Sequence, residues 1–373
     1  MPEIHGIPGE ILLLIALEAG VLVGSAGRWR QVVVPVGLVA ALTAVLAYSY
    51  AFPRAALWPD PSSARNHLLA LVLNLALIAV VAVTRPSRLA VLKTLGVGGC
   101  AVAVYLSLMG TTVGGRLTAE DLNPNAIGHA SALTTVILTG VFVATRRAVW
   151  LVLAGPPVLL LVATQSRGAM VVLGVGWGVL WLLGRAGPIR VAAVAFGTVG
   201  AVLLTQPLQA AMGMLLSRRD ASHLDATIRL DLVRLGIELA MAHPLTGVGY
   251  RQFSVYSGEA LGIPLNAHNE YVRIAAESGL VALALLLMIC ARVAVLRGDP
   301  TTDRPLTAAL AACLTGLAFS NTMSDLRSTL TVWVLLGLAW VARSAVAPAG
   351  PGSALADPAA PAVPATRRAL TSA

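Results

Sequence analysis

Residues 67–84 read HLLALVLNLALIAVVAVT, a run that contains no formally charged side chain at neutral pH. At 1.5 Å per residue, a helix of this length covers about 27 Å, close to the roughly 30 Å of hydrocarbon in a bilayer. Arg85 and Pro86 follow, and they end both the apolar stretch and the regular helix. The segment therefore predicts a membrane-spanning helix.

Similar apolar runs recur along the 373 residues, separated by charge, Pro or Gly. We expect about eleven spans. Residues 165–167 must interrupt the sixth and seventh, because one helix of about 37 residues would overshoot the bilayer. The expected spans are 8–26, 32–52, 67–84, 88–109, 126–145, 148–165, 168–184, 191–210, 271–291, 305–323 and 328–346.

Composition supports the same fold class. Hydrophobic residues make up 57% of the chain and charged residues 12%, about half the charged fraction of soluble domains. Lipid can cover this apolar surface without a polar coat. The sequence thus predicts an all-α, polytopic integral membrane helical bundle.

The net charge of +9 would suggest nucleic acid on a soluble protein. Here the basic residues form short clusters between apolar runs, so we expect no nucleic-acid partner. The three cysteines fall inside apolar runs without metal-ligand spacing. We therefore expect no metal and no cofactor.

Alternate connections differ in basic residues, which predicts orientation. One set holds fifteen: Arg28, Arg30, Arg85, Arg88, Lys93, Arg146, Arg147, Arg185, Arg190, Arg292, Arg297, Arg304, Arg343, Arg367 and Arg368. The opposite short connections hold five: Arg54, Arg65, Arg116, Arg167 and Arg327. The positive-inside rule places the larger set in the cytoplasm and the N-terminus outside.

The chain then divides into a transmembrane domain over 1–346 and an Ala/Pro-rich cytoplasmic tail over 347–373, which we expect to be disordered. The long connection 211–270 faces outside, and it is too long for a linker, so we expect function there.

Part of this loop has a strong helical period. Residues 226–242, ATIRLDLVRLGIELAMA, predict an amphipathic helix lying on the membrane or on the helix bundle. The pairs Asp231–Arg234 and Arg234–Glu238 are typical of a solvated face. Arg229 is the arginine that we expect to be more available for a ligand. The apolar face comprises Ile228, Leu232, Leu235, Leu239 and Ala242.

Two further segments of the loop carry candidate functional residues. In HPLTGVGYRQF (243–253), Gly247 and Gly249 permit a tight turn and a close approach of backbone to a ligand. In NAHNEYVRIAAESG (266–279), helical spacing puts Glu270, Arg273 and Glu277 on one face and His268 on the opposite face with Val272. His268 suits proton transfer near neutral pH. The alternative is a polar group at the membrane interface.

Other polar residues lie at outer helix ends. Arg167 in TQSRGA suits an anion clamp, because its planar donors match phosphate oxygens; the alternative is snorkelling to the interface. Arg116 and DLNPNAIGHA (121–130) form a second outer polar site. His129 there is either a helix-packing residue or a functional one.

These motifs resemble those of the O-antigen ligase and polymerase family of polytopic membrane proteins. The resemblance covers about 120–290 and rests on DLNPNAIGHA (121–130), SRGA (166–169), RLDLVRLGIELA (229–240), HPLTGVGYRQF (243–253) and AHNEYVRIAAESGL (267–280). It implies an all-helical membrane glycosyltransferase in a bacterial cytoplasmic membrane. Such an enzyme moves a glycan from undecaprenyl pyrophosphate to an acceptor hydroxyl on the extracytoplasmic side, without a metal.

The resemblance also implies roles for residues. His268 would be the catalytic base, and Arg167, Arg229 and Arg251 would bind the pyrophosphate. Asn269, Glu270, Gly247 and Gly249 would support them.

Three questions stay open at this point. The protein is a ligase or a polysaccharide polymerase, and the acceptor is a glycan, a lipid or a protein. A transporter or flippase of lipid-linked glycans is the alternative outside catalysis. It should place charge near the bilayer midplane in broken helices, whereas the informative charges here lie at the outer boundary.

Overall fold

The computed structural model describes residues 3–4, 7–8, 18, 33–54, 61–113, 116–119, 122–182, 219–291, 300–320 and 326–344. The expected span 191–210 and the tail 347–373 lie outside these residues, as does most of 8–26. Pro8, the first residue of that last span, belongs to strand β2 (Ile7–Pro8), which pairs antiparallel with β1 (Glu3–Ile4). A helix in this region therefore does not begin at Pro8.

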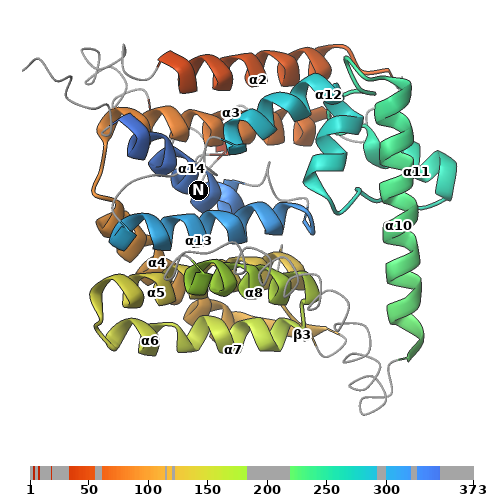
Figure 1. The fold of residues 1–373 in the computed structure, drawn as a ribbon. Helices are drawn as coiled ribbons and strands as arrows, with labels where there is room; N and C mark the ends of the chain where they lie inside the picture. Colours follow the sequence, from red (N-terminus) through yellow and green to blue (C-terminus); the bar gives the residue numbers. More distant parts are fainter. Residues whose placement is uncertain are drawn as a thin grey trace, which may run out of the picture.

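Helices occupy the other predicted spans with small shifts at their ends, because uncharged runs between Arg, Pro and Gly leave few alternatives. In Figure 1 most of them run side by side in stacked rows, while α10 crosses the right-hand ends of those rows. The helices are α2 (Val33–Ala51), α3 (Pro61–Thr84), α4 (Arg88–Met109), α5 (Pro124–Thr145), α6 (Val149–Leu153), α7 (Gly155–Thr164), α8 (Arg167–Leu182), α10 (Arg219–Ala242), α11 (Phe253–Leu261), α12 (Glu270–Ala291), α13 (Pro300–Leu317) and α14 (Leu326–Ser344).

The predicted interruption at 165–167 is confirmed. Helix α7 ends at Thr164, Gln165 adopts a left-handed conformation with φ 50°, and α8 begins at Arg167. A second, unforeseen interruption separates α6 from α7 at Ala154. Pro156 and Pro157 follow it, and their missing N–H groups remove helix hydrogen bonds there.

Within the described residues, length and apolarity mark four helices as able to cross a membrane: Ala64–Thr84, Arg88–Met109, Pro124–Thr145 and Glu270–Ala291. Shorter apolar helices cover Val36–Ala51, Val149–Thr164, Arg167–Leu182 and Leu330–Val341. The protein is therefore a multi-pass helical membrane protein. The number of about eleven spans stays a prediction.

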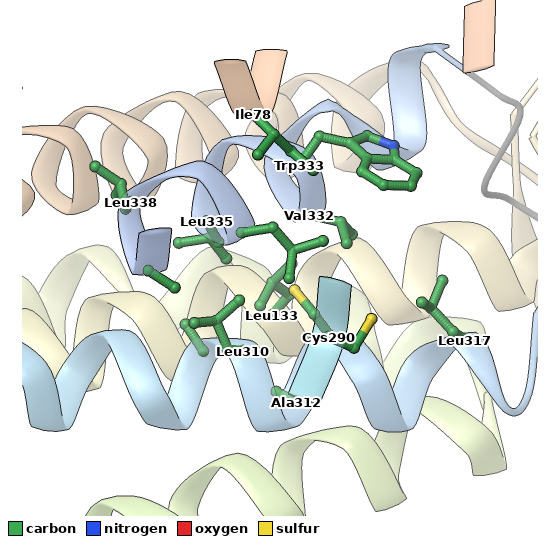
Figure 2. Close-up of a cluster of buried hydrophobic side chains, with 14 of the residues drawn as sticks. Ile78, Leu133, Cys290, Leu310, Ala312, Leu317, Val332, Trp333, Leu335 and Leu338 are labelled. Carbon is green, nitrogen blue, oxygen red and sulfur yellow. The ribbon is translucent and has the colours of Figure 1, made fainter. Parts of the chain in front are cut away.

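The hydrophobic core lies between α3, α5, α12, α13 and α14. Figure 2 shows Ile78, Leu133, Cys290, Leu310 and Trp333 from these five helices converging in one cluster. Small residues bring neighbouring helices close, as is usual where lipid supplies little driving force for association. An added Cβ at Gly140 would lie 2.9 Å from Cβ of Pro305, and one at Gly337 would lie 2.7 Å from Cβ of Val81.

One hairpin near the site departs from the expected all-α fold. Strand β3 (Thr111–Val113) pairs antiparallel with β4 (Arg116–Thr118), with Thr112 opposite Leu117. Thr and Val favour strands, and Gly114-Gly115 between the strands is a dipeptide that hairpin turns favour. The hairpin carries Arg116 to the bundle end where α7 stops.

The bundle has two chemically different ends. At one end Arg88 forms an ion pair with Asp303, and Arg304 donates to the carbonyl oxygen of Leu180 at the end of α8. Arg146, at the end of α5, interacts electrostatically with Arg304. The starts of α5 and α8, which carry the candidate functional residues, therefore lie at the opposite end.

Candidate functional site

Arg116 joins three elements at the break between α7 and α8. Its Nε donates to the carbonyl oxygen of Thr164 at 2.9 Å, and its Nη2 donates to Oδ1 of Asn125 at 2.9 Å. Ser166 donates its hydroxyl to the same Oδ1 at 3.1 Å. Asn123 caps the start of α5 through its side chain. The DLNPNAIGHA segment thus holds the start of α8 in place.

Arg167 is the first residue of α8, and its side chain is exposed. The next residue, Gly168, packs against His129 of α5, since an added Cβ there would lie 2.9 Å from Nε2 of the imidazole. The first turn of a helix presents backbone N–H groups without intrahelical partners and a partial positive charge. His129 therefore lies at a position suited to an anion.

Arg229 approaches this position from α10. Its side chain is half-buried, and its guanidinium interacts electrostatically with His129. Helix α10 begins at Arg219 rather than at residue 226. The structure thus brings Arg229 and the start of α8, where Arg167 stands, to the same histidine.

Helix α10 packs on the bundle through its apolar face. Leu232 is fully buried in a cluster with Phe253 and Ala276. The apolar face of α10 therefore lies on the helix bundle, against α11 and α12, rather than on the membrane. An added Cβ at Gly236 would lie 2.3 Å from Val272, so the crossing requires glycine there. On the outward face, Nη1 of Arg234 lies 3.7 Å from Oδ1 of Asp231, and the two side chains are 74% and 42% exposed, respectively. An ion pair as exposed as this contributes little to stability.

Helix α12 is broken at Gly279, whose φ of 84° and ψ of 170° are not helical. The loop 244–249 fills the break with backbone hydrogen bonds. Leu280 N–H donates to the Pro244 carbonyl oxygen at 2.6 Å, and Val248 N–H donates to that of Ala276 at 2.9 Å. The HPLTGVGYRQF and AHNEYVRIAAESGL motifs are therefore packed together.

At Gly247 and Gly249 the backbone makes close contacts, and these contacts are with other parts of the protein rather than with a ligand. With φ of 64°, Gly247 would place an added Cβ 2.3 Å from the carbonyl carbon of Glu277. With φ of 118°, Gly249 would place one 2.8 Å from Cα of Pro53. These two glycines seat the loop against α12 and the end of α2.

The polar face predicted for α12 is turned inward. Arg273 forms ion pairs with Glu270 and with Oε2 of Glu277, the latter at 3.6 Å, and the three residues are 3%, 0% and 1% exposed. The Phe253 N–H donates to Oε1 of Glu277 at 3.3 Å, and the Arg251 N–H also bonds to Glu277. Buried pairs of this kind are costly to break. The triad fixes the position of the loop that carries Arg251.

His268 lies before α12 rather than on its face with Val272, because the helix begins only at Glu270. Its backbone is left-handed, with φ of 50°, and its side chain is half-buried. Asn269 caps the helix by accepting the Val272 N–H at 3.2 Å. A non-glycine residue with positive φ is uncommon and often marks a functional site. Arg251 shares this property, with φ of 59°.

The start of α12 is tied to the end of α13. Tyr271 donates its hydroxyl to the Leu314 carbonyl oxygen at 2.8 Å, and Phe319, just beyond α13, packs against Gly168. His268 therefore lies at the same end of the bundle as Arg167 and His129. Gly247, Gly249 and Arg251 lie on the loop packed against α12, and Glu270 is the first residue of that helix.

Gln252 is a buried residue that the sequence did not single out. It is fully buried, and neither of its amide atoms has a hydrogen-bond partner within the ranges that the structure describes. In the sequence, Gln252 is marked only by its position in the motif HPLTGVGYRQF (243–253). As for metals, no group of three His, Cys, Asp or Glu residues gathers among the described residues.

A family model matches part of the chain. No curated protein matches the chain. The family model described as O-antigen ligase matches residues 149–287, the segment that runs from α6 into α12 and includes Arg167, Arg229, Arg251 and His268. Over residues 149–287 this chain is similar to the O-antigen ligase family.

Proposed function

We propose that this protein is a metal-independent glycosyltransferase. It moves a glycan from an undecaprenyl pyrophosphate carrier to an acceptor hydroxyl on the extracytoplasmic side of a bacterial cytoplasmic membrane. The observation that carries the proposal is the placement of His268, Arg167 and Arg229 at one end of the bundle, within the O-antigen ligase segment.

His268 takes the proton from the acceptor hydroxyl, whose oxygen then forms a bond to the anomeric carbon of the glycan. The bond from that carbon to the carrier oxygen breaks, and the lipid pyrophosphate leaves with the electron pair. Arg167, Arg229 and Arg251 neutralise the charge that develops on it. Asn269 and Glu270 hold His268 through the start of α12, and Gly247 and Gly249 hold the Arg251 loop.

The distribution of charge supports the extracytoplasmic location. The end with Arg88, Arg146 and Arg304 belongs to the set of connections that the positive-inside rule assigns to the cytoplasm. The opposite end, with His268 and Arg167, then faces outside, where α10 and the motifs that follow it meet the carrier headgroup.

A polymerase would run the same chemistry with a second glycan as acceptor, in place of a lipid or a protein. A flippase is the alternative from another class, and one observation favours it: α12 is a broken helix that contains buried charges. Those charges pair with one another and the loop 244–249 occupies the break, which favours the enzyme.

Proteoliposomes containing the full chain and a radiolabelled lipid-linked oligosaccharide from the producing cells test the proposal. With acceptor present, we expect release of undecaprenyl pyrophosphate. His268→Ala should slow it about 100-fold or more, because general-base catalysis contributes about 10²- to 10⁴-fold. Arg234→Ala is the matched control, since Arg234 is exposed on α10.

Two outcomes would oppose the proposal. Transfer at the wild-type rate by stably inserted His268→Ala and Arg167→Ala variants would remove the catalytic assignment. Movement of the labelled lipid between leaflets without pyrophosphate release would identify a flippase.

A further inference from the structure

We propose that His129 is a further ligand-binding residue of the pyrophosphate site, donating a hydrogen bond to a phosphate oxygen at the start of α8. The inference rests on the proposed function and deepens it by adding a ligand-binding residue from α5. It lies outside the segment matched by the O-antigen ligase model.

The first observation is the state of the imidazole. Both ring nitrogens of His129 are buried and lack a hydrogen-bond partner among the residues that the structure describes. Buried polar atoms are nearly always paired, so an exception calls for a ligand, an ion or a water. A histidine kept only for packing would be replaced at lower cost by an apolar side chain.

The second observation is where the ring lies. Nε2 faces Gly168 in the first turn of α8, and Cβ of Phe319 lies at the same glycine, also 2.9 Å from an added Cβ. An added Cβ at Gly128 would lie 2.7 Å from Cβ of Ser166, so α5 packs closely against the break. His129 therefore lies beside the backbone N–H groups of the first turn of α8, which have no acceptor within the helix.

The third observation is charge. Arg229 acts on His129 from α10, Arg167 opens α8, and the helix start adds a partial positive charge. An imidazole carries at least one N–H donor in either protonation state. Donors from α5, α8 and α10 therefore converge on a single oxyanion, and a phosphate offers several acceptor oxygens to them. His129 is a binding residue here, whereas His268 is the base.

The test is the affinity of purified full-length protein in nanodiscs for undecaprenyl pyrophosphate. His129→Leu should weaken binding about tenfold or more, the range of a lost hydrogen bond to a charged group. His129→Gln should bind within about threefold of wild type, because its amide nitrogen can replace Nε2 as donor. His67→Leu, on α3, is the matched control and should bind as wild type.

Wild-type affinity in His129→Leu would overturn the inference, as would equal weakening in the Leu and Gln variants at unchanged thermal stability. If His129→Leu does not insert, Gly168→Ala decides, because its methyl group would press on Nε2 and should weaken binding about tenfold. Wild-type binding by that variant would also overturn the inference.

Failure of the proposed function would give a different result. A protein that binds undecaprenyl pyrophosphate through His129 yet transfers no glycan supports the inference and removes the glycosyltransferase proposal. A protein that transfers glycan and binds equally well with leucine at position 129 removes the inference alone.

Discussion

The backbone N–H of Leu280 donates to the carbonyl oxygen of Pro244 at 2.6 Å, directly beside the break in α12 at Gly279. A broken helix in a membrane protein must have its freed polar groups satisfied. Here the chain itself satisfies them, 36 residues earlier by the numbering of these two residues. These hydrogen bonds hold the loop that carries Arg251 in a fixed position against α12, the helix that follows His268.

Gly279→Ala should destabilise the protein. Its φ of 84° disfavours any side chain, and an added Cβ would lie 2.5 Å from the Leu245 carbonyl oxygen. We expect a loss of about 1–3 kcal/mol from the strained backbone, plus the clash, measured as a lower midpoint of thermal unfolding in detergent. Gly98→Ala is the control, because nothing lies within 4 Å of its added Cβ. Equal midpoints for the two variants would contradict the account of the break.

Arg273→Met should cost about 3–5 kcal/mol, because it leaves the carboxylates of Glu270 and Glu277 buried without their shared cation. Arg234→Met, which removes an exposed pair, should cost less than about 1 kcal/mol. Urea-dependent proteolysis of the membrane-inserted protein would measure both. Adding Glu270→Gln and Glu277→Gln to Arg273→Met should recover part of the loss; no recovery would mean that charge is not the cause.

His268→Asn should separate structure from chemistry. Asn tolerates a left-handed backbone, so the variant should keep wild-type thermal stability at φ of 50°. Without an imidazole it cannot take the acceptor proton, and transfer should fall by about 10²- to 10⁴-fold. The ratio of transfer rate to the inserted amount measures this. A variant with near-normal transfer would assign His268 to backbone geometry alone.

Arg167→Ala should weaken binding of undecaprenyl pyrophosphate about 10- to 100-fold, the range for charged hydrogen bonds. Arg147→Ala is the matched control, since Arg147 is exposed near the opposite end of the bundle and should not affect affinity. Titration of each nanodisc-inserted variant with the lipid gives the comparison. Similar affinities for the two would favour snorkelling as the role of Arg167.

Much of the fold could be predicted where the sequence itself marks the ends of an element. Helix α4 runs from Arg88 to Met109, as the apolar run between Arg88 and Gly110 predicts. The interruption at Gln165 followed from bilayer thickness. The start of α10 could not be predicted, because residues 219–225 are mostly polar and carry no apolar period.

The candidate site was predictable in composition but less so in geometry. Spacing placed Glu270, Arg273 and Glu277 on one face, and the structure pairs them. The break at Gly279 depends on a loop far away in sequence, so no local pattern reports it. The role of His129 could not be predicted from the sequence, because a histidine that packs between helices and one that binds a ligand have the same helical spacing.

The crossing of α10 over α12 governs how a bulky substrate could arrive. At Gly236 the two helices touch too closely for even a methyl group, with 2.3 Å between an added Cβ and Val272. The part of α10 around Gly236 therefore leaves no room for a headgroup to pass between α10 and α12. The half of α10 that bears Arg229, which interacts electrostatically with His129, is the remaining approach within the described length of α10. Under the proposed function, the carrier headgroup would therefore reach His129 past Arg229 rather than past Gly236.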